Sequence, residues 1–289
     1  MHPAPSVILF SVLSGAGFGL LFYLGLGLVH PFGWLAFCWW GLGYCLAVIG
    51  LLASTFHLGN PKRAWRAFSQ WRTSWLSREA WVSVAALVLL APVAISDWLG
   101  LGWPRQIGWL GGALALATVF TTSMIYAQIK AVPRWHHWLT PAMFLTFALA
   151  GGAILAGQIY APVLLAALVL LLLAIWAVGD GQFARAAQTL GTATGLDRIG
   201  EVTVFEQAHT AGNYLLREMI FVVGRKHAQK LRAIALALTA VIPAIFLAIS
   251  GQIWAFVLAA VCHLIGALAA RWLFFAQAEH VVGLFYGKR

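Results

Sequence analysis

The sequence predicts an all-α integral membrane protein, a polytopic bundle of helices that crosses the bilayer several times. The prediction rests on long apolar runs, on a scarcity of charged side chains, and on basic residues confined to alternate connections. Hydrophobic residues make up 62% of the 289 residues, charged residues only 9%, and the mean hydropathy is +0.87. Because soluble domains carry about 25% charged residues, the composition excludes a soluble globular domain and indicates the membrane class.

Apolar segments long enough to cross a bilayer recur along the whole chain. A transmembrane helix needs about 20 apolar residues, and scanning with a window of that length predicts eight transmembrane helices. We expect them at residues 6–29, 33–56, 79–99, 107–130, 138–159, 162–179, 232–250 and 253–276. The fifth and sixth are joined so tightly, at "QIYAPV", that the number of spans stays open there. We treat residues 1–289 as a single eight-helix membrane domain.

The basic residues predict how this bundle is oriented. With eight spans, both termini lie on one side, together with the connections between spans two and three, four and five, and six and seven. Those connections carry five, two and seven Lys and Arg, the C-terminal end adds Arg271, Lys288 and Arg289, and the other side holds only Arg105. The positive-inside rule then places both termini on the cytoplasmic side, as expected in a bacterial cytoplasmic (inner) membrane. The net charge of +10 reflects this topology, and we expect no nucleic-acid partner.

Metal and haem ligands are scarce in the predicted spans. The three cysteines (Cys38, Cys45, Cys262) lie inside apolar segments with no C-x-x-C spacing, which argues against zinc or iron–sulfur sites. A membrane haem needs two axial histidines that face each other from different helices, and only His263 lies well inside a span. We therefore expect no haem and no metal in this chain, and a packed, hydrogen-bonded histidine at position 263.

Acidic residues also argue against ion transport. All eight acids lie in predicted loops or near helix ends, so no ladder of carboxylates links the two sides of the membrane. A small-solute transporter whose helices break at Pro92, Pro141 and Pro243 remains a remote alternative, because no ionisable partner accompanies these prolines.

Polar chemistry is concentrated instead between the second and third spans, in "FHLGNPKRAWRAFSQWRTSWLSREAW" at residues 56–81. His57 ends the second span, Glu79 opens the third, and Asn60 and Pro61 suit the N-cap and first position of a short interfacial helix. An imidazole and a carboxyl at interface depth suit a quinone head group, since quinone chemistry moves two protons with two electrons. The alternatives are that Glu79 is a first-turn acid favoured by the helix dipole and that His57 only caps a helix end.

At these residues the chain resembles a known family. "HLGNPKRAW", with Glu79 22 residues after His57, is similar to the hallmark of membrane anchor subunits of DMSO-reductase-type molybdoenzymes. "AVPRWHHWLTPAMF" and the closing "FFAQAEHVVGLFYG" extend the resemblance over essentially the whole chain. The resemblance implies a non-catalytic anchor that binds ubiquinone or menaquinone. It also implies two partners, a four-cluster iron–sulfur subunit and a molybdopterin catalytic subunit, with the metal centres in those partners.

The resemblance also implies the site residues. His57 and Glu79 match the quinone-site histidine and glutamate of the family, and we add Gly59, Pro61 and Arg63 of the same motif as quinone-binding candidates. No catalytic residue is expected in the anchor itself. Residues 60–78 and the long connection 180–231 are predicted to dock the iron–sulfur subunit rather than to be solvated loops. The basic residues proposed for docking are Lys62, Arg66, Arg72, Arg198 and Arg217.

The branches of this family differ in which side of the membrane the motif-bearing end of the anchor faces. In the bacterial DMSO reductase the motif side faces the periplasm, whereas here that side carries nearly all the basic residues. In this the chain resembles the branch whose enzymes oxidise sulfite on the cytoplasmic side and pass electrons to quinone. The alternative is an anchor of a DMSO reductase or related enzyme, which oxidises quinol.

Overall fold

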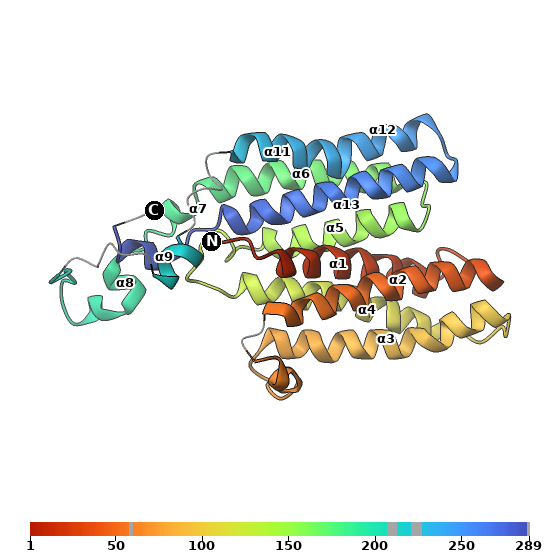
Figure 1. Ribbon diagram of the computed structural model, residues 1–289, viewed down its shortest axis with the longest axis horizontal. Coiled ribbons are helices and arrows are strands. Elements are labelled where there is room, and N and C mark those ends of the chain that lie inside the picture. The colour runs from red at the N-terminus through yellow and green to blue at the C-terminus, as the bar shows by residue number, and fades with distance from the viewer. Residues whose placement is uncertain (58–59, 207–212, 221–226, 288–289) are drawn as a thin grey trace.

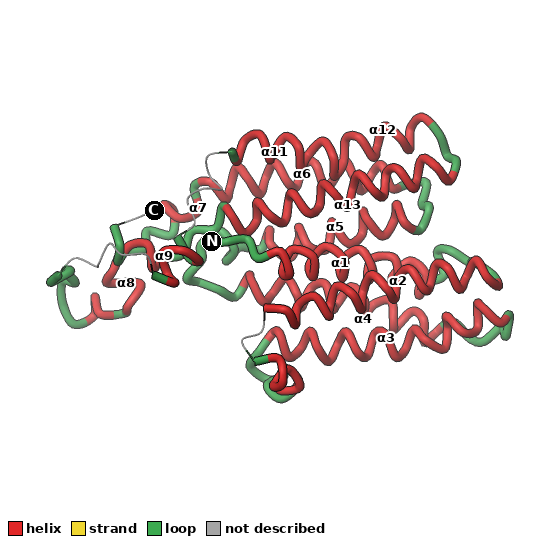
Figure 2. Tube along the Cα trace, in the orientation of Figure 1, coloured by secondary structure: helices red, strands yellow, loops and turns green. Residues whose placement is uncertain are grey.

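The fold is a bundle of long helices that run side by side along the long axis of the molecule (Figure 1). The computed structural model describes residues 1–57, 60–206, 213–220 and 227–287. Every regular element in these ranges is helical and none is a strand (Figure 2). The all-α prediction is therefore confirmed.

The long helices follow the predicted segments in order. They are α1 Pro5–Leu26, α2 Gly33–Ala53, α3 Trp75–Leu99, α4 Gln106–Ala127, α5 Leu139–Leu155, α6 Ala161–Asp180, α11 Ala228–Leu236, α12 Ile242–Ile249 and α13 Ile253–Ala276. A π-helical turn, η4 Ala237–Val241, joins α11 to α12, so these two elements make one continuous span. Seven of the resulting helices are long and apolar enough to cross a membrane, and α5 is apolar but shorter, with 17 residues. The protein is thus a multi-pass membrane protein.

The short helices lie beyond one end of the bundle, where both termini also lie (Figure 1). They are η1 Ser54–His57 and η2 Pro61–Phe68 before α3, then α7 Gln182–Arg185, α8 Leu190–Thr194, η3 Leu196–Arg198 and α9 Tyr214–Glu218 after α6, and η5 Val281–Leu284. The His2 backbone N–H donates to the Glu218 carbonyl at 2.7 Å, and Asn213 Nδ2 donates to the Tyr286 hydroxyl at 2.9 Å. These bonds tie the two terminal segments to the α9 region.

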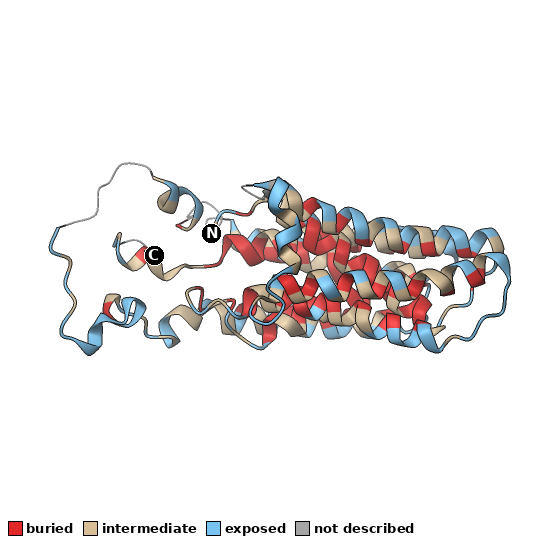
Figure 3. Ribbon diagram, turned by 90° about the horizontal axis from the view of Figure 1, so that it is seen from below, coloured by how far each residue is buried: buried red, intermediate tan, exposed pale blue. Residues whose placement is uncertain are grey.

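Helix α1 is the centre of the bundle, and 72% of its apolar window is buried. A Cβ added at Gly17 would overlap the backbone of Ala47 in α2, and one at Gly19 would overlap the backbone of Ala148 in α5. Glycine at these positions lets the helix backbones touch, which is how membrane helices gain packing energy without a hydrophobic driving force. Buried residues accordingly gather inside the bundle, and exposed apolar residues cover its outside (Figure 3).

Two arginines that were counted among the basic residues of the cytoplasmic end are buried within the bundle. Arg271 is buried in α13, five residues before its last residue, Ala276, and Arg232 is buried in α11. Arg232 pairs with Asp180 at 2.5 Å. Both positions fall within the predicted spans 253–276 and 232–250, but a hydropathy window cannot show that a guanidinium has a partner or an aromatic cover within the bundle.

Candidate functional site

A cavity of about 370 Å³ lies beside Glu79, at the end of the bundle that carries the short helices. Helix α3 and the short helix η2 contribute most of its lining, and α1, α2, α4 and η1 contribute the rest. Its lining residues are Phe10, Leu51, Ser54, Thr55, Ala64, Trp65, Ala67, Phe68, Leu76, Glu79, Ala80, Ser83, Val84, Ile125 and Tyr126. Among these lining residues, Glu79 is the one whose side chain is a carboxyl group. The volume falls in the range of small-molecule sites, which are mostly apolar with few polar groups.

Helix η2 forms one wall of the cavity. It is a 3-10 helix with Pro61 at its first position and Asn60 as N-cap, as predicted, although the Asn60 side chain makes no capping bond. Residues three apart lie on one face of such a helix, and Trp65 and Phe68 both line the cavity. The Phe68 ring meets the Trp81 ring edge to face at 5.3 Å, and Trp81 Nε1 donates to the Phe68 carbonyl at 2.9 Å. These contacts fix η2 to α3.

Glu79 belongs to the α3 wall of the cavity and is only 4% exposed. Thr122 Oγ1 of α4 donates to Glu79 Oε1 and also lies 2.9 Å from the Thr118 carbonyl oxygen. A hydroxyl has one proton but two acceptor lone pairs. If Glu79 is a carboxylate, Thr122 donates to it. If Glu79 is protonated, it can donate to Thr122, which then donates to the Thr118 carbonyl. The pair therefore suits a carboxyl that gains and loses a proton.

The position of Glu79 on its helix bears on the alternative reading of this residue. Helix α3 begins at Trp75, four residues before the predicted start of the third span, and its first turn contains no acid. The helix-dipole interaction falls off within the first turn. Glu79 is therefore too far along the helix to act mainly as a first-turn acid.

The other predicted quinone-binding residues are not among the described residues that line the Glu79 cavity. Arg63 lines a second cavity of about 370 Å³ on the outer side of η2, and this cavity shares Ala64, Ala67 and Leu76 with the first. The His57 backbone ends η1, but its side chain, the Pro61 side chain and Gly59 lie outside the described residues. The structure therefore brings Glu79 and the η2 aromatics together and places Arg63 next to them.

The five basic residues predicted to dock the partner are all exposed: Lys62, Arg66, Arg72, Arg198 and Arg217. Arg66 lies 5.6 Å from the ring centroid of Trp65, and Arg72 lies 5.5 Å from that of Trp71. The short elements that carry Arg198 and Arg217, η3 and α9, lie beyond the same end of the bundle (Figure 1).

Two residues of the site were not found from the sequence, Thr122 and Tyr126. Both lie on α4, and Tyr126 lies near the end of that helix at Ala127. The Tyr126 ring contacts those of Trp135, Phe144 and Phe274 at centroid distances of 5.4 to 5.7 Å. The spacing of 118, 122 and 126 places these residues on one helix face, but nothing in the sequence shows that this face meets Glu79.

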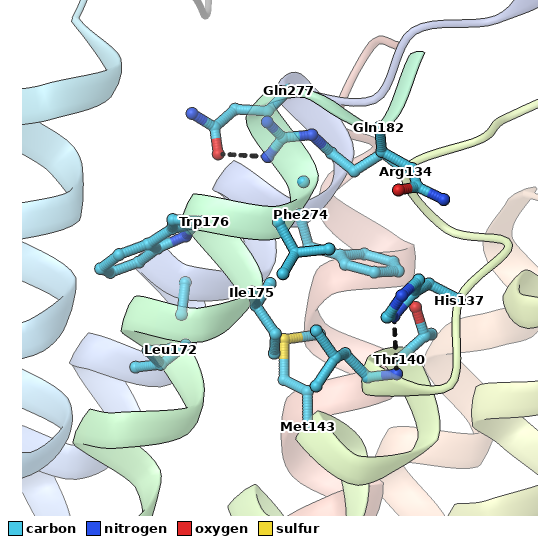
Figure 4. Close-up of a pocket in the computed structure, with 14 residues that line it drawn as sticks. Arg134, His137, Thr140, Met143, Leu172, Ile175, Trp176, Gln182, Phe274 and Gln277 are labelled. Carbon is cyan, nitrogen blue, oxygen red and sulfur yellow. Dashed lines mark hydrogen bonds between the residues drawn. The ribbon is translucent and has the colours of Figure 1, made fainter. Parts of the chain in front are cut away.

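A smaller cavity of about 30 Å³ lies between α5, α6 and α13 (Figure 4). Arg134 Nη1 donates to Gln277 Oε1 at 3.2 Å above it, and Arg134 also pairs with Asp180. Partial burial lowers the pKa of His137 at its edge, and the neighbouring Arg185 and His136 lower that pKa further. This volume holds only one or two waters, so the cavity is too small for a quinone head group.

Within the described ranges, no three His, Cys, Asp or Glu side chains lie close enough together to hold a metal ion. His263 is buried, and its Nδ1 lies 2.6 Å from the Thr239 carbonyl oxygen, in agreement with a hydrogen-bonded core histidine.

Comparison with known proteins identifies the family. The sequence model of the DMSO reductase anchor subunit (DmsC) matches residues 1–288. A sulfite dehydrogenase subunit of Allochromatium vinosum is 31% identical over 99% of both sequences. The YnfH protein of Escherichia coli, an anaerobic dimethyl sulfoxide reductase chain, is 31% identical over 55% of this sequence and 57% of its own. Another anaerobic dimethyl sulfoxide reductase chain of the same organism is 31% identical over 41% of this sequence and 42% of its own.

No solved structure matches the chain significantly. The family match decides against the small-solute transporter. The two cavities beside η2, the apolar bundle and a match over nearly the entire sequence lead to one conclusion: the chain belongs to the DMSO reductase anchor subunit family, the membrane anchors of molybdoenzyme complexes.

Proposed function

We propose that this chain is the quinone-reactive anchor of a molybdoenzyme complex and passes electrons between an iron–sulfur partner subunit and the membrane quinone pool. The observation that carries the proposal is the cavity of about 370 Å³ in which buried Glu79 faces aromatic and aliphatic walls. A quinone head group needs such an apolar, flat-walled site with a proton donor at its rim. The exposed basic residues near the same end would receive the partner.

The residues of this site can handle the protons of quinone chemistry. A bound quinone supplies the electron acceptor, and its reduction takes up two protons with two electrons. Glu79 donates one proton and recovers it from water on the near side, while Thr122 hydrogen-bonds either protonation state. We expect His57, at the end of η1, to bind the second carbonyl end of the ring. Trp65 and Phe68 stack near the ring, and Arg63 lies in the adjoining cavity.

We further propose that α5 completes eight spans and that the whole chain forms one domain in the cytoplasmic (inner) membrane, with both termini in the cytoplasm. A helix of 17 residues is about 25 Å long, which suffices where the bilayer thins locally or flanking residues reach the interface. The exposed basic residues Lys62, Arg66, Arg72, Arg198 and Arg217 would then face a cytoplasmic iron–sulfur subunit.

For the substrate of the complex we propose sulfite, with electrons flowing to quinone. The support is the sulfite dehydrogenase relative, which matches over 99% of both sequences, whereas the two dimethyl sulfoxide reductase relatives match over about half or less. The basic end of the bundle adds to this support because it favours a cytoplasmic partner. An anchor that oxidises quinol for dimethyl sulfoxide reduction is the second candidate.

The test is Glu79→Gln in the assembled complex, compared with His57→Ala. We expect both variants to assemble and to transfer electrons to a soluble artificial acceptor at the wild-type rate. With a water-soluble ubiquinone or menaquinone analogue, their turnover should fall about tenfold or more, as for loss of a general acid or base. Turnover with the soluble artificial acceptor, measured on the same preparations, is the control for assembly and for the catalytic subunit. Full quinone turnover in both variants would place the quinone site elsewhere.

A further inference from the structure

Arg271 is an unusual residue for the interior of a membrane bundle. It is 3% exposed on α13, and its guanidinium carbon lies 3.5 Å from the centroid of the Phe144 ring. Phe147 and Phe274 lie farther out, at 5.3 and 6.0 Å. Its Nη1 has no hydrogen-bond partner, and no carboxylate of the described residues forms an ion pair with it. Aromatic rings offset only a part of the cost of a desolvated cation.

Glu79, at the same end of the bundle, is a buried acid without a basic partner among the described residues. It is buried, and Thr122 is the hydrogen-bond partner that the structure gives its carboxyl. No Lys or Arg in the described ranges lies within ion-pair distance of it. The bundle thus buries one cation and one acid, each without a direct counter-charge, in surroundings where opposite charges attract over longer distances than in water.

Tyr126 connects these two residues. Its ring stacks on Phe144 at 5.7 Å and meets Phe274 at 5.5 Å, and both of these rings also contact Arg271. On its other side Tyr126 lines the Glu79 cavity. Tyr126 therefore belongs both to the lining of the Glu79 cavity and to the aromatic cluster that covers Arg271.

The cavity next to the Arg271 guanidinium leaves no room for an anionic ligand. The space next to Arg271 is a cavity of about 10 Å³ whose lining includes Ser11 of α1, Phe147 of α5 and His263 of α13. That volume is too small for a carboxylate or phosphate ligand. The titratable groups that face Arg271 are Tyr126 from α4 and His263 from its own helix, whereas α1 and α5 present Ser11 and aromatic or aliphatic side chains there. A protonated His263 would be a second cation. Glu79 is the acid whose cavity Tyr126 also lines.

We propose that Arg271 is a positioning residue for the quinone reaction: its fixed positive charge acts across Tyr126 and stabilises the carboxylate that Glu79 becomes when it gives up its proton. The inference rests on the proposed function. In that step the O–H bond of Glu79 breaks and an O–H bond forms on a quinone oxygen. The electrons come from the iron–sulfur partner subunit, and Glu79 is then reprotonated from near-side water. Arg271 touches neither the quinone nor the transferred proton.

The test compares Arg271→Met, which keeps length and loses charge, with Arg271→Lys, which keeps the charge, in the assembled complex. Lys130→Gln removes one exposed cation from the same end of the bundle, outside the predicted docking segments, and is the matched control. We expect Arg271→Met to retain turnover with a soluble artificial acceptor but to lose about tenfold with a quinone analogue, a barrier increase of about 1.4 kcal/mol. Arg271→Lys should restore most of that loss, and Lys130→Gln should have no effect.

Two further readouts separate electrostatics from packing. Because a nearby positive charge favours the ionised form of an acid, the alkaline limb of quinone turnover should move to higher pH in Arg271→Met and stay in place in Arg271→Lys. In a double-mutant cycle, Arg271→Met should cost nothing more once Glu79→Gln is present. A full additional loss in that background, or equal loss with Met and Lys, would overturn the proposal. Unimpaired quinone turnover in Glu79→Gln alone would instead refute the proposed function.

Discussion

Arg105 Nη2 lies 2.6 Å from Asp97 Oδ1, at the end of the bundle opposite the Glu79 cavity. Trp40 Nε1 donates to the other carboxylate oxygen of Asp97 at 3.0 Å. The single basic residue on that side is therefore neutralised within the protein, and the exposed positive charge of the described residues lies at the other end. This pairing strengthens the orientation expected from the positive-inside rule.

Asp97→Asn should destabilise the protein by about 1–3 kcal/mol, because the partly buried Arg105 loses a charge-assisted hydrogen bond. The amide oxygen can still accept from Trp40, so the fold should persist. Thermal unfolding of the purified complex in detergent measures the effect. An unchanged midpoint would mean that solvent or lipid compensates Arg105 without Asp97.

The orientation can be tested by single cysteines at Gly200 and Gly102, in a background where Cys38, Cys45 and Cys262 are replaced by Ser. Gly200 follows η3 and Gly102 lies in the connection between α3 and α4, on opposite ends of the bundle. We expect a membrane-impermeant maleimide to label Gly200→Cys only in inside-out vesicles and Gly102→Cys only in right-side-out ones. The reverse pattern would place the basic end in the periplasm and the partner with it.

Thr122→Val should slow quinone turnover about tenfold, because the Glu79 carboxyl loses a hydrogen-bond partner in a buried site. Thr121→Val is the matched control, since the Thr121 hydroxyl lies within hydrogen-bond distance of the Ala117 and Thr118 carbonyl oxygens on its own helix and not of Glu79. Turnover with the two variants and a quinone analogue, normalised to the rate with a soluble acceptor, measures the difference. Equal rates in both would show that the Thr122 hydroxyl is dispensable.

Docking of the iron–sulfur partner through the exposed basic residues predicts a charge-reversal effect. The double variant Arg66→Glu/Arg72→Glu should insert into the membrane but retain less of the partner during purification, and the loss should grow with ionic strength. Lys130→Glu reverses one exposed charge outside the predicted docking segments and should retain the partner. Undiminished co-purification of the double variant would assign these arginines to topology alone.

The positions of the helices could be predicted from the sequence because the constraint is local. In a bilayer each backbone polar group must be satisfied within its own segment, so a long apolar run forms a helix whatever its neighbours are. The predicted segments match α1 to α6 and α11 to α13 with ends shifted by a few residues. One such shift had a consequence for function, because the earlier start of α3 takes Glu79 out of the first turn.

The sequence by itself determined the class of protein, the family, the orientation expected for the bundle and the choice of Glu79 as a candidate site residue, since each depends on composition or on residues close together in the chain. Only the tertiary structure decided what surrounds Glu79. Thr122 and Tyr126 come from α4, and Arg271 comes from α13, nearly 200 residues later in the sequence. Their meeting depends on how the helices pack, and in a uniformly apolar bundle packing follows shape and close backbone approach rather than any hydropathy pattern. For the same reason the sequence showed Arg271 only as a basic residue at the C-terminal end, whereas its cover of phenylalanine rings exists only once α5 and α13 have packed together.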